Sequence, residues 1–343
     1  MKYLNTSCHH LFIDKGTHEK FKGGAEAINN FQEFARSSVK LTQENENTQE
    51  YLFNHGSSVK SEFEAYMDDP NHWDVFSERL AASLLGEQQE SQKNLDRFKR
   101  KVKVTPGSLL LIHCKPSDND VETLVLIKME QEEVANVEDF EHLFGLPTEK
   151  KALNTALVTF EKGKEPALWV SRANAYWIKF LDVSPIRSSS VNTSNAFDAI
   201  DGQLNKFKKD FKADHLLVRN HLLTYLRNHD GDTISYQDII ETVVLAHKPV
   251  DSKFKPNEWA KRLLELPKKT KKTFDKQFEV DMSSVKAKRK SVISLTDKID
   301  LNLKDGIENI NEVIEPFDDR SGRKGIIIYS EQGYEHFMKN TEE

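Results

Sequence analysis

The stretch GSLLLIHCKPSDNDVETLVLIKME, residues 107–130, constrains the fold more than any other part of the chain. Two runs of apolar, strand-forming residues stand on either side of the sequence PSDND, whose composition is typical of a turn. The residues TPG directly before the first run also indicate a turn. The sequence therefore predicts a hairpin that supplies central strands of a sheet.

The same stretch contains the pair His113 and Cys114 inside its first apolar run. Neighbouring side chains of a strand point to opposite faces of the sheet. A base and a nucleophile on opposite faces cannot act together, so a catalytic dyad is excluded here. We expect this pair to serve packing or a satisfied hydrogen bond.

Apolar spacing and turn residues indicate further elements on both sides of this hairpin. Expected helices are 59–102, broken at Pro70 and Gly86, then 196–211, and a helix pair at 214–246. Expected strands are 8–14, 157–160, ALWVS at 167–171, AYWIKFLD at 175–182, and the terminal runs VISL, IDLNL, INEVIEPF and KGIIIYS. This order predicts an α+β protein with an N-terminal domain, 1–195, of helices around a central sheet, and a C-terminal domain, 196–343, with the helix pair and terminal strands.

The helix pair at 214–246 has the clearest pattern in the chain. Its leucines form a helical stripe that stops at NHDGD, after which Ser235 is placed to cap a second apolar helix. A helix-turn-helix DNA reader would give this pattern, but two helices packed into a core give it more often. We interpret the pair as packed helices.

Composition excludes several classes of protein. The longest apolar runs, 109–112 and 124–127, are far shorter than the roughly 20 residues of a membrane-spanning helix. The N-terminus lacks the sustained apolar stretch of a secretory signal. The chain has two cysteines, which excludes a disulfide framework and fits a reducing compartment. A cytoplasmic protein without a membrane partner is the expectation.

Charge is distributed unevenly along the chain. The formal net charge is −6, yet residues 253–290 contain 13 Lys or Arg against five acids, which leaves −14 for the remainder. A solvated face would explain one short basic run. Here two basic runs, 255–276 and 286–290, lie close together in the sequence, which favours a surface that binds a polyanion. The candidate DNA-binding residues are Lys261, Arg262, Lys268, Lys269, Lys271, Lys272, Lys276, Lys286, Lys288, Arg289 and Lys290.

No known metal or nucleotide motif is present. Cys8, His9 and His10 could hold a metal only with a distant ligand, because no CxxC, HxxxH or HExxH spacing completes a site. The sequence also contains neither a P-loop nor GxGxxG. We expect no cofactor and no bound metal.

Metal-dependent nucleases place one acid after a strand and an acid-x-Lys on the next strand. Asp118 and Asp120 occupy the turn of the hairpin and Lys128 lies on its second run, but Leu126 stands where the second carboxylate is needed. A magnesium ion would lose an oxygen ligand there. This substitution predicts a protein that is not an enzyme.

The order of these motifs resembles the bacterial nucleoid-associated proteins of the NdpA (YejK) type. The resemblance covers roughly residues 100–343, from the hairpin through NAYWIKFLDVSPIRSSSVNTSNAFDAID and ISYQDIIETVV to FEVDMSSVKAKRKSVISLTDKIDLNL, and includes HHLFIDK near the start. It implies DNA association without catalysis. The family's aromatic-led strand, basic loop and Phe-containing helix correspond to 176–180, Arg187 and Phe197, although Arg187 is the only cation in this loop.

Together these observations predict a non-catalytic nucleoid-associated protein that binds double-stranded DNA with little sequence specificity. Phosphate contacts by Lys and Arg give such binding, and no Cys/His finger or basic zipper offers base readout. Pairing two copies into a homodimer would raise the affinity. Alternatives are a protein-interaction module with an acidic partner, or a nuclease-like component, in a mobile-element or phage-defence system.

Overall fold

The computed structural model describes residues 1–45, 48–98, 103–115, 121–135, 142–145, 153–161, 163–171 and 174–337. The chain combines helices with a large antiparallel sheet, so the expected α+β class is confirmed. The chain divides into two compact units. Unit 1 consists of residues 1–188 with 275–277, and unit 2 consists of 189–274 and the chain from 278 onward. The division falls after Ser188 rather than after residue 195, because residues 189–204 form one uninterrupted helix.

Unit 1 contains ten strands and four α-helices among its described residues. They are β1 (Lys2–Phe12), β2 (Thr17–Lys20), α1 (Ala25–Glu44), β3 (Gln49–Phe53), α2 (Ser58–Asp68), the 3-10 turn η1 (Pro70–His72), α3 (Trp73–Arg97), β4 (Gly107–Lys115), β5 (Glu122–Glu130), β6 (Glu132–Ala135), β7 (His142–Gly145), β8 (Leu153–Phe160), β9 (Ala167–Ser171), α4 (Ala175–Leu181) and β10 (Val183–Pro185).

An eight-stranded antiparallel sheet organises unit 1, in the order β10-β3-β9-β8-β5-β4-β1-β2. Strands β4 and β5 pair in the register Gly107 with Glu130 through Cys114 with Thr123, which confirms the predicted hairpin. Every residue of β4 from Gly107 to Cys114 is buried. The hairpin therefore lies in the interior of the sheet with both faces covered.

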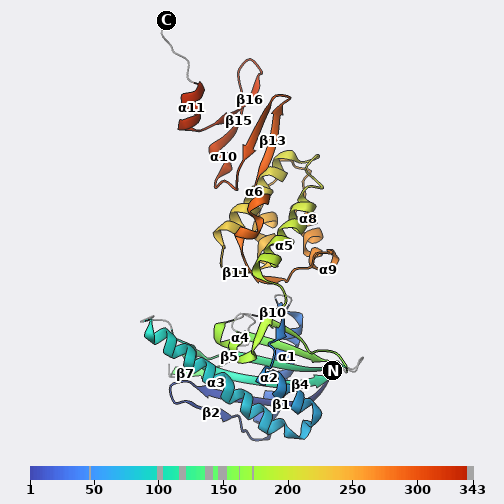
Figure 1. Cartoon of the computed structure of the whole chain (residues 1–343), viewed down its shortest axis with the longest axis vertical. Helices are drawn as coiled ribbons and strands as arrows, with labels where there is room; N and C mark the ends of the chain where they lie inside the picture. Colours follow the sequence, from blue (N-terminus) through green and yellow to red (C-terminus); the bar gives the residue numbers. More distant parts are fainter. Residues whose placement is uncertain are drawn as a thin grey trace. The chain divides into compact units, whose positions relative to one another are not determined.

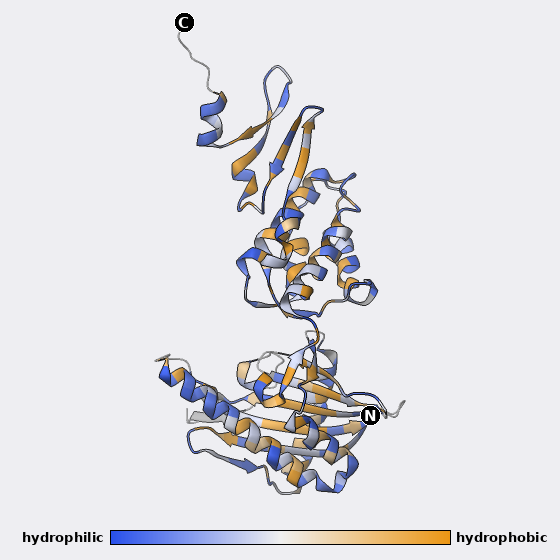
Figure 2. Cartoon of the chain, viewed as in Figure 1, coloured by the Kyte–Doolittle hydropathy of each residue, from blue (hydrophilic) through white to orange (hydrophobic). Residues whose placement is uncertain are grey.

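Helices cover both faces of this sheet (Figure 1). Apolar residues of α2, α3 and α4 form one core with the strands, and residues of α1 form a second core on the opposite face. Figure 1 shows α3 lying across the strands. Figure 2 shows hydrophobic residues gathered in the strands, whereas α3 carries many hydrophilic residues on its surface. Burial of apolar area on both sides is the main stabilising contribution in such a layered unit.

His113 and Cys114 face different cores, as predicted. The Nδ1 atom of His113 lies 2.6 Å from the hydroxyl of Tyr66, and its Nε2 atom lies 2.9 Å from a carboxylate oxygen of Glu122. Cys114 packs on the α1 side, where burial raises the pKa of its thiol to about 11. The histidine is thus a satisfied buried polar group.

Unit 2 begins with helices, and two hairpins and a short last helix follow. Its elements are α5 (Ser189–Leu204), α6 (Lys212–Asn228), β11 (Thr233–Ser235), α7 (Tyr236–Ile240), the π-helical turn η3 (Glu241–Leu245), α8 (Pro256–Leu264), α9 (Leu266–Lys269), β12 (Gln277–Glu279), the 3-10 segment η4 (Met282–Lys288), β13 (Ser291–Thr296), β14 (Ile299–Leu303), α10 (Ile310–Val313), β15 (Ile314–Asp318), β16 (Lys324–Ile328) and α11 (Glu331–Phe337).

The predicted helix pair forms the centre of unit 2. Helix α6 ends at Asn228, and the hydroxyl of Ser235 accepts a hydrogen bond from the amide of Asp238 at 3.0 Å, which caps α7 as expected. Ile239 and Leu222 are among the apolar residues of the pair that share one core. The interpretation as packed helices is confirmed.

Two sequence-based expectations about local structure in unit 1 were wrong. Residues 175–182 were expected as a strand, but α4 occupies 175–181 and buries Tyr176, Trp177 and Phe180 against the sheet. Their aromatic side chains favour strands in isolation, and packing overrides that preference. Gly86 does not interrupt α3, because it is exposed and a lone helical glycine costs only about 1 kcal/mol.

Two further expectations differ in unit 2. The helix expected at 196–211 is α5, which begins at Ser189 and ends at Leu204. The run INEVIEPF is a helical turn, α10, followed by strand β15 rather than one strand. Because α10 has only four residues, its apolar spacing cannot distinguish a turn of helix from a strand.

Candidate nucleic-acid interface

The predicted basic segment, residues 253–290, is part of the folded core of unit 2 rather than a linker. It contains α8, α9 and η4, and it buries Phe254, Leu263 and Phe278 in the core that also holds the helix pair. Its apolar residues fix the backbone, so its cations project from a defined scaffold. Lys276 is an exception, because residues 275–277 belong to unit 1.

Carboxylates pair with several cations of this segment. The ammonium groups of Lys288 and Lys272 lie 2.6 and 3.4 Å from Asp198 on α5. Arg289 lies 3.2 Å from Asp305. Lys269 pairs with Glu265 one helical turn before it. Exposed pairs of this kind contribute little stability and can exchange partners, but they reduce the local positive potential.

The remaining cations of the segment occupy separate environments. Arg262 stacks on the ring of Trp259, with its guanidinium 4.6 Å from the ring centroid, and it lines a cavity of about 510 Å³ with Lys206, Lys269 and Glu265. Lys261, Lys271 and Lys286 are exposed, and the side chain of Lys268 lies outside the described part of the chain. Lys290 lines a different and larger cavity. The predicted residues therefore do not form one continuous site.

The larger cavity of unit 2 has a volume of about 840 Å³ and a strongly basic lining, and we refer to it as the basic groove. Its walls come from the loop after α5, the first turns of α6 and the start of β13. Four exposed lysines surround it. The lining residues with charged or polar side chains are Asp201, Asn205, Lys208, Lys209, Lys212, His215, Arg219, Lys290, Ser291 and Ser294.

Arg219 lies at the base of the basic groove and is nearly buried. Its Nε atom donates to Asp201 at 2.6 Å, and a terminal nitrogen donates to the carbonyl of Lys288 at 2.8 Å. Its guanidinium also faces the ring of Phe197 at 5.8 Å. Asp201 is the one carboxylate among the described residues of the lining, and Arg219 neutralises it. Within this described lining, the charge of the four lysines therefore has no acidic counterpart.

His215 is an uncharged member of this lining. Its Nε2 atom lies 3.2 Å from the side-chain oxygen of Asn205. Burial is the main cause that lowers the pKa of His215 to about 4; the charges of Lys208 and Arg219 act in the same direction, and Asp201 acts against them. The imidazole therefore stays neutral at physiological pH, and lysines provide the exposed positive charge of the groove.

The first turn of α6 adds a second source of positive potential. Lys212 and Ala213, its first two residues, line the groove, and no side chain caps this end of the helix. Asp214 in the same turn is buried and accepts hydrogen bonds from the amides of Val250 and Asp251. Uncapped amides at a helix N-terminus carry partial positive charge and favour anions.

Three of the four groove lysines lie outside the predicted segment. Lys208, Lys209 and Lys212 belong to the run KFKKDFK, residues 206–212, which was read as the end of a helix. Four lysines in seven residues, interleaved with phenylalanines, were the signal that could have identified them. Phe207 is buried, so its aromatic side chain anchors the loop that presents the lysines.

Lys128, one of the residues of the nuclease-like alternative, lies inside the sheet of unit 1. This side chain is fully buried, and its ammonium donates to the carbonyls of Thr105 and Met129 at 3.4 and 3.3 Å. Burial lowers its pKa to about 8. The predicted acids Asp118 and Asp120 lie outside the described residues.

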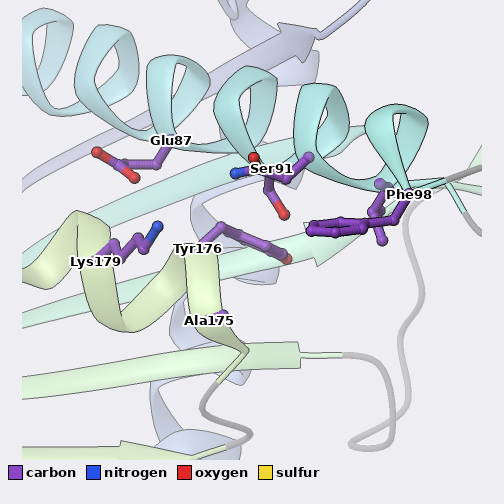
Figure 3. Close-up of a pocket in the computed structure, with 8 residues that line it drawn as sticks. Glu87, Ser91, Phe98, Ala175, Tyr176 and Lys179 are labelled. Carbon is purple, nitrogen blue, oxygen red and sulfur yellow. The ribbon is translucent and has the colours of Figure 1, made fainter.

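A smaller cavity in unit 1 has a different character. It lies between α3 and α4, has a volume of about 210 Å³, and is lined by Glu87, Ser91, Phe98, Tyr176 and Lys179 among others (Figure 3). Figure 3 shows the ring of Phe98 beside Tyr176 at the C-terminal end of α3. Among the described residues, its lining contains one cation, Lys179, and one carboxylate, Glu87.

No protein-family model matches the chain, and no curated protein matches it. Within the described ranges, no helix combines the length and the apolar character needed to span a bilayer. The residues that carry the NdpA-type resemblance have structural contacts: Arg187 lies 2.8 Å from Glu50 and 2.6 Å from Asp275, and Phe197 is buried beneath Arg219. The resemblance itself stays a prediction.

Proposed function

We propose that the chain is a non-catalytic, double-stranded DNA-binding protein that acts in the bacterial nucleoid, and that the basic groove of unit 2 contacts the phosphates. The observation that carries the proposal is the gathering of Lys208, Lys209, Lys212 and Lys290 around one cavity. Among the residues lining the groove, the single carboxylate, Asp201, is paired with Arg219. Such a surface attracts a polyanion.

Lysine side chains explain why binding would depend little on DNA sequence. Each exposed ammonium is a mobile point charge that neutralises a phosphate without a fixed approach angle. Base recognition depends more often on bidentate side chains such as Arg held against a base edge. The Arg219 guanidinium is engaged by Asp201 and Lys288, so it stabilises the groove instead of reading bases. Phosphate contacts position a protein on the duplex without specifying a sequence.

Salt dependence of binding tests this assignment. The logarithm of affinity for short duplexes should fall linearly with the logarithm of salt concentration, with a slope of about −0.9 per phosphate neutralised. Replacing all four groove lysines by Ala should flatten this slope by up to about 3.6 and weaken unrelated duplexes alike. Fluorescence anisotropy across a salt series provides the measurement.

Two quadruple variants serve as controls. The variant K268A/K269A/K271A/K272A removes cations of the predicted segment, two of which already pair with carboxylates, and should flatten the slope less. The variant K15A/K93A/K103A/K164A removes four exposed lysines of unit 1 and should leave it nearly unchanged. Equal losses in all three variants would contradict the groove assignment, because total charge would then govern binding. Co-purification of a stoichiometric protein without nucleic acid would favour the protein-interaction alternative.

A second candidate function, self-association into a homodimer, is favoured by the terminal hairpins. Strands β15 and β16 form a sheet of only two strands, as do β13 and β14. Isolated two-stranded hairpins are marginally stable in water. These hairpins and the residues that follow them expose large apolar side chains: Leu295, Ile299, Phe317, Ile326, Ile327, Ile328, Tyr329 and Tyr334.

We infer that a second copy of the chain covers this surface. Exposed apolar patches mark interaction sites on soluble proteins, and Ile326 and Ile328 are exposed on the same face of β16. A dimer would present two basic grooves to one duplex, and the second would bind at a high effective concentration. Self-association would thus increase DNA affinity without any additional contact per subunit.

A further inference from the structure

Three side chains from different elements of unit 1 converge at one edge of the sheet. His9 comes from β1, His18 from the edge strand β2, and Glu78 from α3, which packs on both strands. The potential ligand atoms of these residues all lie within 4.8 Å of one another. Because Glu78 is far from both histidines in the sequence, no short spacing motif contains all three residues.

His9 has an unusual environment for a buried polar residue. Its side chain is fully buried, and neither ring nitrogen has a hydrogen-bond partner among the described residues. Buried polar atoms in proteins nearly always have a partner, and leaving one without a partner costs about 1–3 kcal/mol. The neighbouring ring of His18 lies edge-on with its centroid 5.7 Å away. A bound cation would satisfy a nitrogen of His9 that is otherwise unsatisfied.

His18 and Glu78 provide the remaining ligands and a route to solvent. The Nδ1 atom of His18 lies 3.4 Å from a carboxylate oxygen of Glu78, yet this contact does not have hydrogen-bond geometry. Their side chains are 19% and 47% exposed, so an ion can enter from the surface. The nearby ammonium of Lys20 lies 2.5 Å from Asp74, which reduces its repulsion of a cation.

We propose that His9, His18 and Glu78 bind one divalent transition-metal ion of the zinc class. Two imidazoles and a carboxylate suit zinc better than magnesium or calcium, which prefer oxygen ligands. Zinc binds such ligands at about 2.0–2.2 Å in tetrahedral geometry, which places two ligand atoms roughly 3.4 Å apart. The His18–Glu78 distance already matches this spacing, and His9 needs only a small side-chain movement. The fourth position is left for water.

The neighbouring residues of β1 explain why His9 alone of the early cluster takes part. Cys8 packs in the opposite core with Val39 and Leu110, and burial raises the pKa of its thiol to about 12. His10 has its Nδ1 atom 2.7 Å from the hydroxyl of Ser108. The bound ion would tie β2, an edge strand of four residues, to both β1 and α3. Its effect is therefore on the stability of unit 1 and is independent of the basic groove.

Zinc titration of the chelator-treated full chain tests this site. We expect calorimetry to show one equivalent of Zn²⁺ bound per chain and the melting temperature to rise with zinc concentration, because the ion binds the folded state. Co²⁺ in the same site should give the visible absorption of a tetrahedral complex. His9→Phe and Glu78→Gln should each weaken zinc binding by more than the roughly 10–100-fold lost when an outer-shell partner is removed.

A matched control and a metal-free comparison separate this proposal from a purely structural role. His72→Ala removes a surface histidine 3.1 Å from Asp69 and should leave zinc affinity unchanged. Without metal, His9→Phe should be as stable as the parent or more stable, because two unsatisfied nitrogens are removed. Absence of saturable zinc binding in the parent, or unchanged binding in the variants, would overturn the proposal. If His9→Phe does not fold, the zinc affinity of Glu78→Gln tests the proposal, because Glu78 is half-exposed and its substitution leaves the core intact.

Discussion

His113 illustrates what reasoning from single residues can and cannot establish. Its place on a strand follows from the apolar runs around it, and its opposition to Cys114 follows from strand geometry alone. Its partners do not follow. Tyr66 comes from α2 and Glu122 from the neighbouring strand, and only the packing of those elements brings them within 2.6 and 2.9 Å. Packing of separate elements likewise brings His18 and Glu78 beside His9, and the sequence does not reveal that the ammonium of Lys128 is buried.

At the residue scale, His215 should make the stability of unit 2 depend on pH. Its pKa falls from the ordinary value of 6.5 to about 4 through burial, with Lys208 adding repulsion. Between these two values the unfolded chain binds a proton that the folded chain does not, so the free energy of unfolding decreases as the pH falls from about 6.5 toward 4. Above about 6.5 this group has no effect.

The variant His215→Gln should therefore lose less melting temperature than the parent between pH 7 and pH 5. Thermal unfolding at several pH values, followed by circular dichroism, gives the measurement. His336→Gln, at an exposed position of unit 2, is the matched control and should behave like the parent. A His215→Gln variant with the full pH dependence of the parent would show that this imidazole is charged in the folded protein.

At the scale of elements, the sequence predicts secondary structure best where the spacing of apolar residues and the flanking turn residues indicate the same element. The hairpin of β4 and β5, the cap of α7 and the terminal strands all have both signals. No side chain caps helix α4 among the described residues. Its seven residues make only two turns, which is too short for its apolar residues to show a helical period. Its helical state depends on the sheet against which Trp177 and Phe180 pack. Short segments of this kind are decided by tertiary contacts.

At this scale, we predict that acidic substitutions on the exposed face of β16 prevent self-association. Residues 326 and 328 point to the same side of the strand, so Ile326→Glu with Ile328→Glu places two charges on one apolar face. If a second copy covers this face, the double variant should be monomeric at concentrations where the parent is dimeric. Multi-angle light scattering over a concentration series measures this mass.

Two acidic substitutions elsewhere on unit 2 control for added charge. Ser252→Glu with Asn257→Glu changes exposed polar positions and should leave the mass unchanged. The circular dichroism spectrum of the hairpin variant should match that of the parent, since its side chains at 326 and 328 are exposed. A parent that is monomeric throughout the series would rule out the homodimer.

At the scale of the whole molecule, the division into two units with separate cores predicts separate unfolding. Chains with more than one core often depart from two-state behaviour. Gly107 offers a way to perturb one unit, because a Cβ atom there would lie 1.9 Å from the carbonyl oxygen of Met129. Calorimetry should show Gly107→Ala lowering one unfolding transition. The second transition and the salt slope of DNA binding should be unchanged.

Gly86→Ala is the control, since a Cβ atom at that position meets no neighbour within 4 Å. It should leave both transitions in place or raise one slightly, as glycine is unfavourable within a helix. A single transition that moves as a whole with Gly107→Ala would mean that the two units unfold cooperatively.

The basic groove depends on the fold of unit 2 as well as on its sequence. The sequence predicted a basic surface in the C-terminal part, and Lys290 belongs to both the predicted segment and the basic groove. Lys208, Lys209 and Lys212 join it only because α5, α6 and β13 meet around Arg219. Pairing of Lys288 with Asp198 likewise depends on distant elements. Counts of charge along a sequence do not reveal which cations are already neutralised.

Residues 275–277 belong to unit 1 although the chain on either side of them belongs to unit 2. Asp275 is buried there and accepts from Arg187 at 2.6 Å and from the amide of Glu50 at 3.4 Å. Neither unit is therefore encoded by one continuous stretch of the gene. Recombination could not transplant unit 1 as a single cassette without leaving this buried carboxylate behind, so we expect evolution to have retained or lost the two units together.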